Sequence, residues 1–184
     1  MTKKEKEKSK TSWDIFDIVE IFIICTALIV TVFSLFIRMT VVDGTSMEST
    51  LLDGQYLLID DIMYTPKRGD IVVVNDYSKT DIYSKPLVKR VVALAGDTIE
   101  IKNGVLYLNG EEKTEEYIKE PMNVSTNLAL TQIAEHEVFV MGDNRNASGD
   151  SRRFGTVDER CIVGKAFLRV FPFNTISFLK NPEK

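Results

Sequence analysis

Lys89 lies in the middle of an apolar run, Pro86 to Ala95, that reads as a β-strand. Successive strand residues point to opposite faces, so Lys89 shares a face with Leu87 and Val91. Burial disfavours the ammonium form of lysine and lowers its pKa, so this side chain must find a buried partner or release its proton. A neutral lysine amine is a general base. The alternative is a lysine that extends past its neighbours to water from a half-exposed strand.

Ser46 is a candidate for the nucleophile that such a base would activate. It lies in the segment Asp43 to Leu51, where Gly44 lets the backbone approach another group closely. Serines in turns more often cap or bend the chain, so Ser46 points to catalysis only in combination with a base.

The histidine content restricts the choice of that base. His136 is the only histidine, and its position between Glu135 and Glu137 is typical of a solvated surface residue. A Ser-His-Asp arrangement would have to use it, whereas a Ser-Lys pair needs no histidine. One histidine and two distant cysteines, Cys25 and Cys161, also lack the ligand set of a zinc site, so we expect no metal and no other cofactor.

An uncharged N-terminal run is the element that would hold these groups near a membrane. It extends from Ile21 to Ile37, and apolar residues from Ile15 onward lengthen it enough to cross a bilayer. A cleaved signal peptide would have a shorter apolar region followed by small residues, but Phe33 to Arg38 follows here. We therefore predict a cytoplasmic basic tail at 1–14, a transmembrane anchor at 15–38 and an extracytoplasmic domain at 39–184.

The distribution of positive charge predicts the orientation of this anchor. Only Arg38 closely follows the span, whereas five lysines precede it: Lys3, Lys4, Lys6, Lys8 and Lys10. Because loops rich in lysine and arginine stay in the cytoplasm, we expect a single-pass cell-membrane protein with its N-terminus inside.

The chain after the span is typical of a β-dominated domain. The clearest hairpin is Thr98 to Gly110, where Asn103-Gly104 supplies the turn between two alternating arms. No long amphipathic helix appears, which favours a mainly β barrel or sandwich. We expect strands at 56–62, 70–74, 87–95, 98–101, 105–108, 137–141 and 162–171, with a less regular excursion at 111–135.

Three segments together resemble bacterial type I signal peptidase, in its short single-span form. They are Ser46-Met47 just beyond the anchor, Lys89-Arg90 in an apolar strand leading to Gly96-Asp97, and the loop from Gly142 to Arg152. Each segment alone is weak, but their order and spacing are specific, and the resemblance covers nearly the whole chain. It implies a signal-peptidase-like β-barrel or sandwich domain behind one N-terminal transmembrane helix. It also implies a membrane-bound serine endopeptidase that removes signal peptides from exported preproteins.

The resemblance assigns roles to individual residues. Ser46 would be the nucleophile and Lys89 the general base, with Ser148 holding the lysine amine and Met47 contacting the substrate. The Ser46 amide would contribute to the oxyanion hole near Gly44 and Thr45, where some members of the family have a serine at the position of Gly44. The resemblance implies structural roles for five further residues, of which Asp150 and Arg152 would form an ion pair: Arg90, Asp143, Arg145, Asp150 and Arg152.

Two positions depart from the usual family pattern. Ser49 precedes Thr50 where the family usually has proline, and Ala95 precedes Gly96 where it again usually has proline. Proline fixes φ and stiffens a turn, so these changes affect the expected rigidity of the nucleophile segment rather than the identity of the nucleophile.

The expected partners are exported preproteins with small residues at the cleavage site, together with the lipid bilayer, and no nucleic acid. One rival hypothesis is a catalytically weak or inactive homologue that acts as a membrane-anchored assembly or chaperone factor for surface proteins. A second is a sortase that uses Cys161 and His136, which would leave Lys89 unexplained. A third is a self-cleaving Ser-Lys repressor relative, although an apolar segment replaces its DNA-binding helices.

Overall fold

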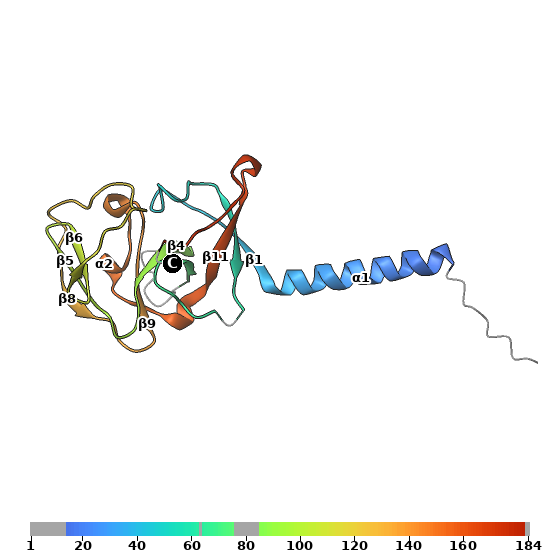
Figure 1. Ribbon diagram of the computed structural model, residues 1–184, viewed down its shortest axis with the longest axis horizontal. Helices are drawn as coiled ribbons and strands as arrows, with labels where there is room; N and C mark the ends of the chain where they lie inside the picture. Colours follow the sequence, from blue (N-terminus) through green and yellow to red (C-terminus); the bar gives the residue numbers. More distant parts are fainter. Residues whose placement is uncertain (1–13, 63, 76–84, 183–184) are drawn as a thin grey trace, which may run out of the picture. The chain divides into compact units, whose positions relative to one another are not determined.

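The computed structural model describes residues 14–62, 64–75 and 85–182, and the chain divides into two units at residues 36 and 37 (Figure 1). The first unit contains helix α1, Ile15–Phe36, which has 22 residues. Within the described residues, no helix reaches the combined length and hydropathy that a membrane span requires. The predicted anchor is therefore a proposal rather than an observation. Residues 37 and 38, which we had assigned to it, belong to a strand.

The second unit is built mainly from β-strands, as the sequence predicts. Its larger sheet has eight strands in the order β1-β2-β11-β3-β4-β9-β10, with β12 paired to β11. The neighbouring strands all run antiparallel. The bounds are β1 Ile37–Val41, β2 Tyr56–Asp60, β3 Ile71–Val74, β4 Leu87–Ala93, β9 Glu137–Met141, β10 Val157–Asp158, β11 Ile162–Phe171 and β12 Ser177–Phe178.

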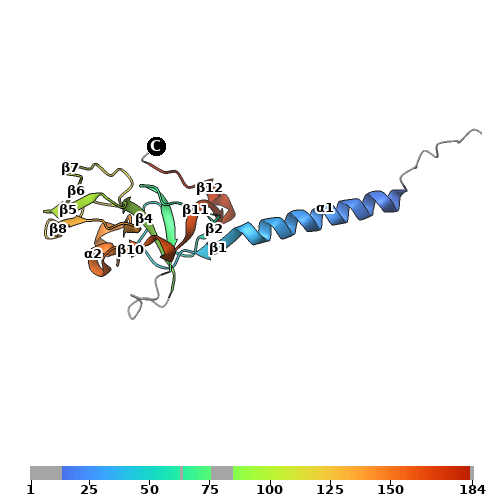
Figure 2. The same ribbon diagram turned by 90° about the horizontal axis from the view of Figure 1, so that it is seen from below.

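A smaller sheet carries the hairpin that the sequence predicts. Its order is β7-β6-β5-β8, with β5 Thr98–Lys102, β6 Val105–Leu108, β7 Glu111–Glu112 and β8 Leu128–Gln132 (Figure 2). Asn103 and Gly104 both have positive φ, 51° and 78°, which is the backbone conformation that a tight two-residue hairpin turn needs. Strands β7 and β8 lie in the region that we expected to be an irregular excursion with short strands.

The short helices lie between the later strands. Among the described residues, helix α2 covers Ser151–Phe154, and three 3₁₀ turns cover η2 Arg145–Ala147, η3 Glu159–Cys161 and η4 Phe173–Thr175. Three apolar clusters fill the interior. One lies against the smaller sheet and includes Ile99 and Phe139, a second includes Met47 and Leu57, and a third includes Val72 and Val140.

Strand β4 lies inside the larger sheet, between β3 and β9. Lys89 is opposite Val72 of β3, and Arg90 is opposite both Ile71 of β3 and Met141 of β9. From Val88 to Ala93 every residue is buried. The hypothesis that Lys89 reaches water from a half-exposed strand is therefore wrong, because the strand has neighbours on both sides and Lys89 is only 2% exposed.

Gly164 of β11 is required for the close approach of β11 to β2. A Cβ atom there would lie 2.4 Å from the Asp60 carbonyl oxygen and 2.7 Å from Cγ2 of Ile59. Because the nearest obstacle is backbone, it cannot rotate away. We predict that Gly164→Ala lowers the free energy of unfolding by about 1–3 kcal/mol. Urea unfolding of the full chain in neutral detergent, followed by circular dichroism, measures this loss.

Leu130→Ala is the matched control, because Leu130 is 65% exposed in β8. Its cost should stay within about 0.5 kcal/mol. Equal stability of Gly164→Ala and wild type would show that the two strands are not packed as closely as described.

Candidate active site

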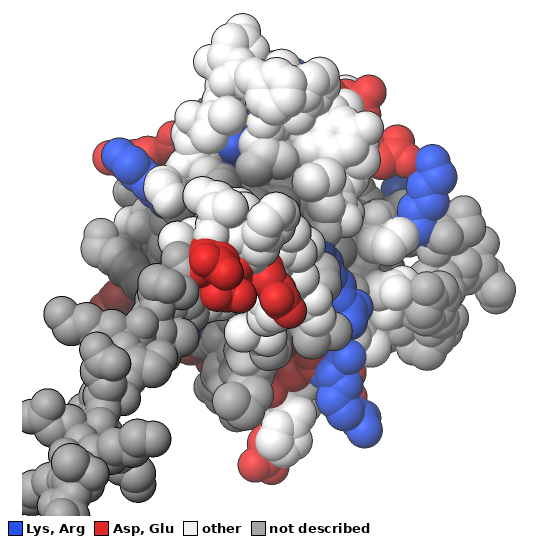
Figure 3. Space-filling view, turned by 90° about the vertical axis from the view of Figure 1, so that its right-hand side faces the viewer, with Lys and Arg blue, Asp and Glu red and all other residues white. Residues whose placement is uncertain are grey.

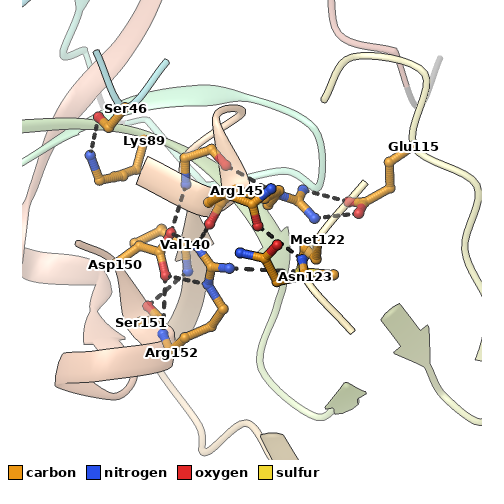
Figure 4. Close-up of polar contacts among 12 residues, drawn as sticks. Ser46, Lys89, Glu115, Met122, Asn123, Val140, Arg145, Asp150, Ser151 and Arg152 are labelled. Carbon is orange, nitrogen blue, oxygen red and sulfur yellow. Dashed lines mark hydrogen bonds and ion pairs between the residues drawn. The ribbon is translucent and has the colours of Figure 1, made fainter. Parts of the chain in front are cut away.

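Ser46 and Lys89 meet beside strand β4, in the interior of the larger sheet. The Lys89 Nζ atom lies 2.6 Å from the Ser46 Oγ atom and 3.2 Å from the Val88 carbonyl oxygen. Figure 4 shows the serine and the lysine side chain pointing toward each other. Lys89 comes from a buried strand, whereas Ser46 comes from the turn after Asp43. The structure therefore brings together two residues 43 positions apart in sequence.

Burial controls the charge of Lys89. Desolvation lowers the pKa of Lys89 from 10.5 to about 8. The carboxylates of Asp150 and Asp143 favour the charged form and partly oppose this effect. The nearby guanidinium of Arg152 assists the lowering. No carboxylate among the described residues forms an ion pair with this amine. A substantial fraction of Lys89 is therefore neutral near pH 8 and able to accept a proton.

Hydrogen bonds on both sides fix the turn that carries Ser46. The Thr50 and Leu51 amides donate to the Met47 carbonyl, at 3.1 and 2.8 Å. The Asn144 amide donates to the Ser46 carbonyl at 3.0 Å. Met47 itself is 1% exposed and belongs to the core, so one part of the turn is anchored in the interior while Ser46 stays partly exposed.

A cavity of about 310 Å³ opens beside Ser46 and Lys89. The turn forms one wall, the start of β4 forms the other, and the η2 loop contributes a third side. The lining residues are Val42, Asp43, Gly44, Thr45, Ser46, Met47, Lys85, Pro86, Leu87, Val88, Lys89, Ala147 and Gly149. The cavity can therefore hold a short peptide segment against the serine hydroxyl.

The expected oxyanion donors differ in their availability. Gly44 has a φ of +90°, and its amide donates to the Asp53 carboxylate at 2.7 Å, so this N–H is already engaged. Thr45 is exposed, and its carbonyl accepts from the Asn144 side chain. Among the described residues, no partner accepts from the Ser46 amide, which remains available for an oxyanion.

Ser148 lies close to the reactive pair but does not bind it here. Its hydroxyl is buried and has no hydrogen bond of good geometry among the described residues, although it is close enough to Asp150 to help lower the pKa of that carboxyl. A Cβ atom at Gly142 would lie 2.4 Å from both the Ser148 Oγ atom and the Ser46 carbonyl oxygen. Gly142 thus allows the two serine segments to approach each other.

A buried ion pair lies behind the nucleophile turn. Arg90 donates to Asp143 through Nε and Nη2, at 2.8 and 2.6 Å, and the two side chains are 1% and 0% exposed. Arg90 also donates to the Gly69 carbonyl, and the Thr50 hydroxyl donates to Asp143 at 2.5 Å. Thr50 therefore links the nucleophile turn to a charge pair that spans β4 and the Gly142 loop.

A second ion pair closes the same loop. Arg152 donates to both carboxylate oxygens of Asp150, at 2.8 and 2.7 Å, and to the Arg145 carbonyl at 2.7 Å. Burial alone would raise the pKa of Asp150, but the Arg152 guanidinium and the Gly142 amide hold it below its ordinary value. Figure 4 shows Arg152 beside Asp150. This ion pair stabilises the Gly142 loop, whose Asn144 amide donates to the Ser46 carbonyl.

Sequence reasoning missed the contribution of the excursion at 111–135. The buried Arg145 donates to both carboxylate oxygens of Glu115 through its Nη1 and Nη2 atoms. The Tyr117 ring lies 4.3 Å from the Arg90 guanidinium and 5.8 Å from that of Arg145. The Ser49 hydroxyl donates to the Tyr117 carbonyl at 2.6 Å. The excursion therefore stabilises the turn that carries Ser46. In the sequence, its acidic and aromatic residues were the only indication of this role.

The alternative catalytic residues lie elsewhere. The His136 side chain is 75% exposed beside Glu159, and Cys161 packs against the cluster that contains Val72. Neither lines the cavity at Ser46. No group of three or more potential metal ligands occurs within the described part of the chain.

Comparison with known proteins identifies the family. The model of the family described as "Signal peptidase, peptidase S26" matches residues 15–171. The chain is 37% identical to signal peptidase I P of Bacillus subtilis subsp. natto, over 96% of this chain and 99% of that protein. It is 34% identical to signal peptidase I of Bacillus licheniformis, over 96% and 98% of the two chains.

Two further matches come from other genera. The chain is 34% identical to signal peptidase IB of Staphylococcus aureus strain MRSA252, over 77% of this chain and 82% of that protein. A crystal structure of a signal peptidase I from Enterococcus faecalis V583 is 28% identical and covers 56% of this chain and 98% of that one, with a TM-score of 0.46. On the family match and the full-length relatives, this chain belongs to the signal peptidase family, peptidase S26.

Proposed function

We propose that the protein is a type I signal peptidase, a membrane-bound serine endopeptidase that removes signal peptides from exported preproteins. The observation that carries the proposal is the 2.6 Å contact between the Ser46 hydroxyl and the desolvated Lys89 amine. Similarity to signal peptidases I over nearly the full chain supports the same activity.

Acylation would begin with proton transfer inside this pair. Neutral Lys89 accepts the Ser46 proton while the Oγ atom attacks the carbonyl carbon of the scissile peptide bond. The tetrahedral oxyanion accepts a hydrogen bond from the Ser46 amide, which has no other described partner. The lysine then gives its proton to the leaving amine, and the C–N bond breaks to leave an acyl ester on Ser46.

Deacylation would use the same base on water. Lys89 accepts a proton from the attacking water, and the new oxyanion collapses to expel the serine Oγ, which recovers the proton from the lysine. Buried Asp150 and Asp143 favour the ammonium that forms transiently, so they stabilise the charged base without contacting it. Arg90, Arg145 and Arg152 would act structurally by holding those carboxylates in place.

The cavity beside Ser46 suits an extended cleavage segment with small side chains. Its volume of about 310 Å³ suits a short stretch of small side chains, and its lining combines small residues such as Gly44 and Ala147 with larger apolar ones such as Leu87 and Val88. Met47 forms part of its wall but is otherwise buried, so it would contribute shape rather than a mobile contact. The Ser148 hydroxyl, which has no hydrogen-bond partner among the described residues, would be the group that holds the lysine amine during the reaction.

Helix α1 would anchor the protein in the cell membrane as a single pass, with the N-terminus in the cytoplasm and residues from 39 onward outside. The uncharged run from Ile21 to Ile37 and the lysines before it support this orientation. Enzyme and preprotein would then meet at one interface, which reduces the orientational cost of the encounter.

We predict that Ser46→Ala and Lys89→Met each lower kcat for a preprotein by at least about 10³-fold, because each removes one half of the reacting pair. The measurement is release of the signal peptide from a purified preprotein in neutral detergent, followed by mass spectrometry. Methionine keeps the length of the lysine side chain, so the strand should stay packed.

Lys102→Met is the matched control, since Lys102 is an exposed strand lysine that contacts Glu100 and the Tyr107 ring and does not line the cavity at Ser46. Its activity should equal that of wild type. Wild-type turnover by either dyad variant would contradict the assignment, and absence of any cleavage by the wild-type protein would favour the inactive-homologue hypothesis.

We predict that kcat/KM rises with pH through about 8, because only the neutral Lys89 amine is a base and its pKa is lowered to about 8. Below that pH the rate should fall about tenfold per pH unit.

The same pKa shift predicts how stability depends on pH. The pKa of Lys89 in the folded state lies below its value in the unfolded state, so the unfolded state binds more protons between about pH 8 and 10.5. The free energy of unfolding should therefore rise with pH in that window. Lys89→Met should lose this rise, and an unchanged slope in the variant would argue against a buried neutral lysine.

We predict that Ser49→Pro lowers activity by at least about tenfold and stability by more than about 1 kcal/mol. Ser49 has a φ of +95°, whereas proline is fixed near −65°, and its hydroxyl binds the Tyr117 carbonyl. Ser49→Gly, which tolerates this φ, should stay folded and active. A Ser49→Pro variant as active and stable as wild type would mean that the turn adopts the conformation usual for the family.

A further inference from the structure

A second cavity lies on the other side of the nucleophile turn from Lys89. It has a volume of about 470 Å³ and is formed by the turn, the buried Arg90-Tyr117 pair and the C-terminal segment. Its lining residues are Ser49, Thr50, Arg90, Tyr117, Arg169, Ser177, Phe178, Leu179, Lys180, Asn181 and Pro182. Apart from the shared turn, none of them belongs to the cavity beside Ser46.

Positive charge in this cavity is not balanced by described residues. Arg169 donates to the Ser177 hydroxyl at 2.9 Å and the Thr175 carbonyl at 2.8 Å, with longer contacts at 3.4 Å to the Thr50 carbonyl and Gln55. All these acceptors are neutral. Within the described residues, neither Arg169 nor Lys180 forms an ion pair, and no aspartate or glutamate lines the cavity.

Arg90 does not add to this unbalanced charge, because Asp143 neutralises it within the core. Within the described residues, the cavity therefore presents two cations without a carboxylate partner: Arg169, which four contacts hold in place, and Lys180, which is exposed on the C-terminal segment. The Nε, Nη1 and Nη2 atoms of Arg169 already donate to neutral acceptors, so this guanidinium keeps its positive charge and offers a phosphate only a remaining Nη2 N–H, while Lys180 supplies the second cation.

The segment that leads into the cavity lining carries exposed apolar and aromatic side chains, of which Phe178 itself lines the cavity. Phe173, Ile176 and Phe178 are 77%, 55% and 74% exposed, and Phe171 stacks edge-on against both Tyr56 and Phe173. The turn η4 and strand β12, which carry these residues, form the red hairpin that projects from the domain in Figure 1. The top of the domain is correspondingly uncharged in the space-filling view of Figure 3.

We propose that this cavity binds the phosphate of an anionic phospholipid. Arg169 and Lys180 would contact the phosphate, and the hairpin with Phe173, Ile176 and Phe178 would lie among the acyl chains. The inference rests on the proposed membrane location of the protein. A basic cavity next to an aromatic segment is complementary to a molecule that combines a phosphate with a hydrocarbon tail, as neither free phosphate nor an acidic peptide does.

The site is connected to the nucleophile turn through Arg169, whose Nη1 atom contacts the Thr50 carbonyl. Thr50 in turn donates to Asp143, the partner of Arg90. Anchoring Arg169 on a phosphate would therefore support the turn from the side opposite Lys89.

The experiment is native mass spectrometry of the full chain released from neutral detergent, titrated with phosphatidylglycerol or with phosphatidylcholine of the same chain length. We expect one retained phosphatidylglycerol and at least about fivefold weaker binding in each of Lys180→Gln and Arg169→Gln, since a cation near a lipid phosphate contributes about that factor. Lys102→Gln, which removes a cation from the smaller sheet, should bind like wild type. The unfolding midpoint of each variant shows whether it is folded, and Lys180, being exposed, should not affect folding.

Equal binding of the two lipids, or wild-type binding by the Lys180→Gln and Arg169→Gln double variant, would overturn the proposal. Displacement of the lipid by millimolar inorganic phosphate would likewise overturn it, since it would assign the site to free phosphate. The readout does not depend on proteolysis: Ser46→Ala should keep the lipid, so failure of the lipid site and failure of the peptidase assignment give different results.

Discussion

The removal of the Lys89 amine from water is the constraint on which the rest of the structure depends. An ammonium group in this position would lose its hydration without gaining a carboxylate contact, and desolvation accordingly lowers its pKa to about 8. The amine then meets the Ser46 hydroxyl at 2.6 Å. Strand β4 has neighbours on both sides, so the fold itself enforces the burial that makes a lysine a base.

Two buried charge pairs keep the surroundings of this amine in place. Arg90 with Asp143 supports the nucleophile turn through Thr50, and Arg152 with Asp150 braces the loop that contacts the Ser46 carbonyl. The carboxylates of Asp143 and Asp150 are close enough to Lys89 to favour its protonated form. Their negative charge is largely balanced by the arginine with which each is paired. In the proposed mechanism, these pairs would let the site hold a neutral Lys89 at rest and tolerate its charged form during the reaction.

Much of this arrangement was predictable from sequence because its signals are local or chemically unusual. A lysine inside an apolar strand, a turn with glycine before serine, and the near neighbours Asp150 and Arg152 all stand out. The strands at 137–141 and 162–171 have the predicted bounds, because alternation and flanking turn residues define them. The role of each site residue remains a proposal, since distance alone does not demonstrate catalysis.

Other features depend on contacts that no pattern reports. Strand β1 continues the apolar run of α1, so hydrophobicity could not separate the two. Glu115 and Tyr117 reach the site from an irregular excursion, across 30 residues in the case of Glu115 and Arg145. The positive φ of Ser49 likewise appears only when the chain is folded, as does the position of Arg169, which has no carboxylate partner among the described residues. Ser148 was expected to hold the Lys89 amine, but that amine is directed to Ser46 and to the Val88 carbonyl.

The most direct test of the central claim is a titration of Lys89 itself. Selective ¹³C labelling of lysine, with Lys89→Met used to assign the signal, allows the side-chain chemical shift to be followed by NMR as pH changes in the full chain. The account predicts a midpoint close to 8 for Lys89, well below that of the exposed lysines. A midpoint near the ordinary value of 10.5 would show an amine that stays charged at neutral pH, and would contradict the claim that burial makes it a base.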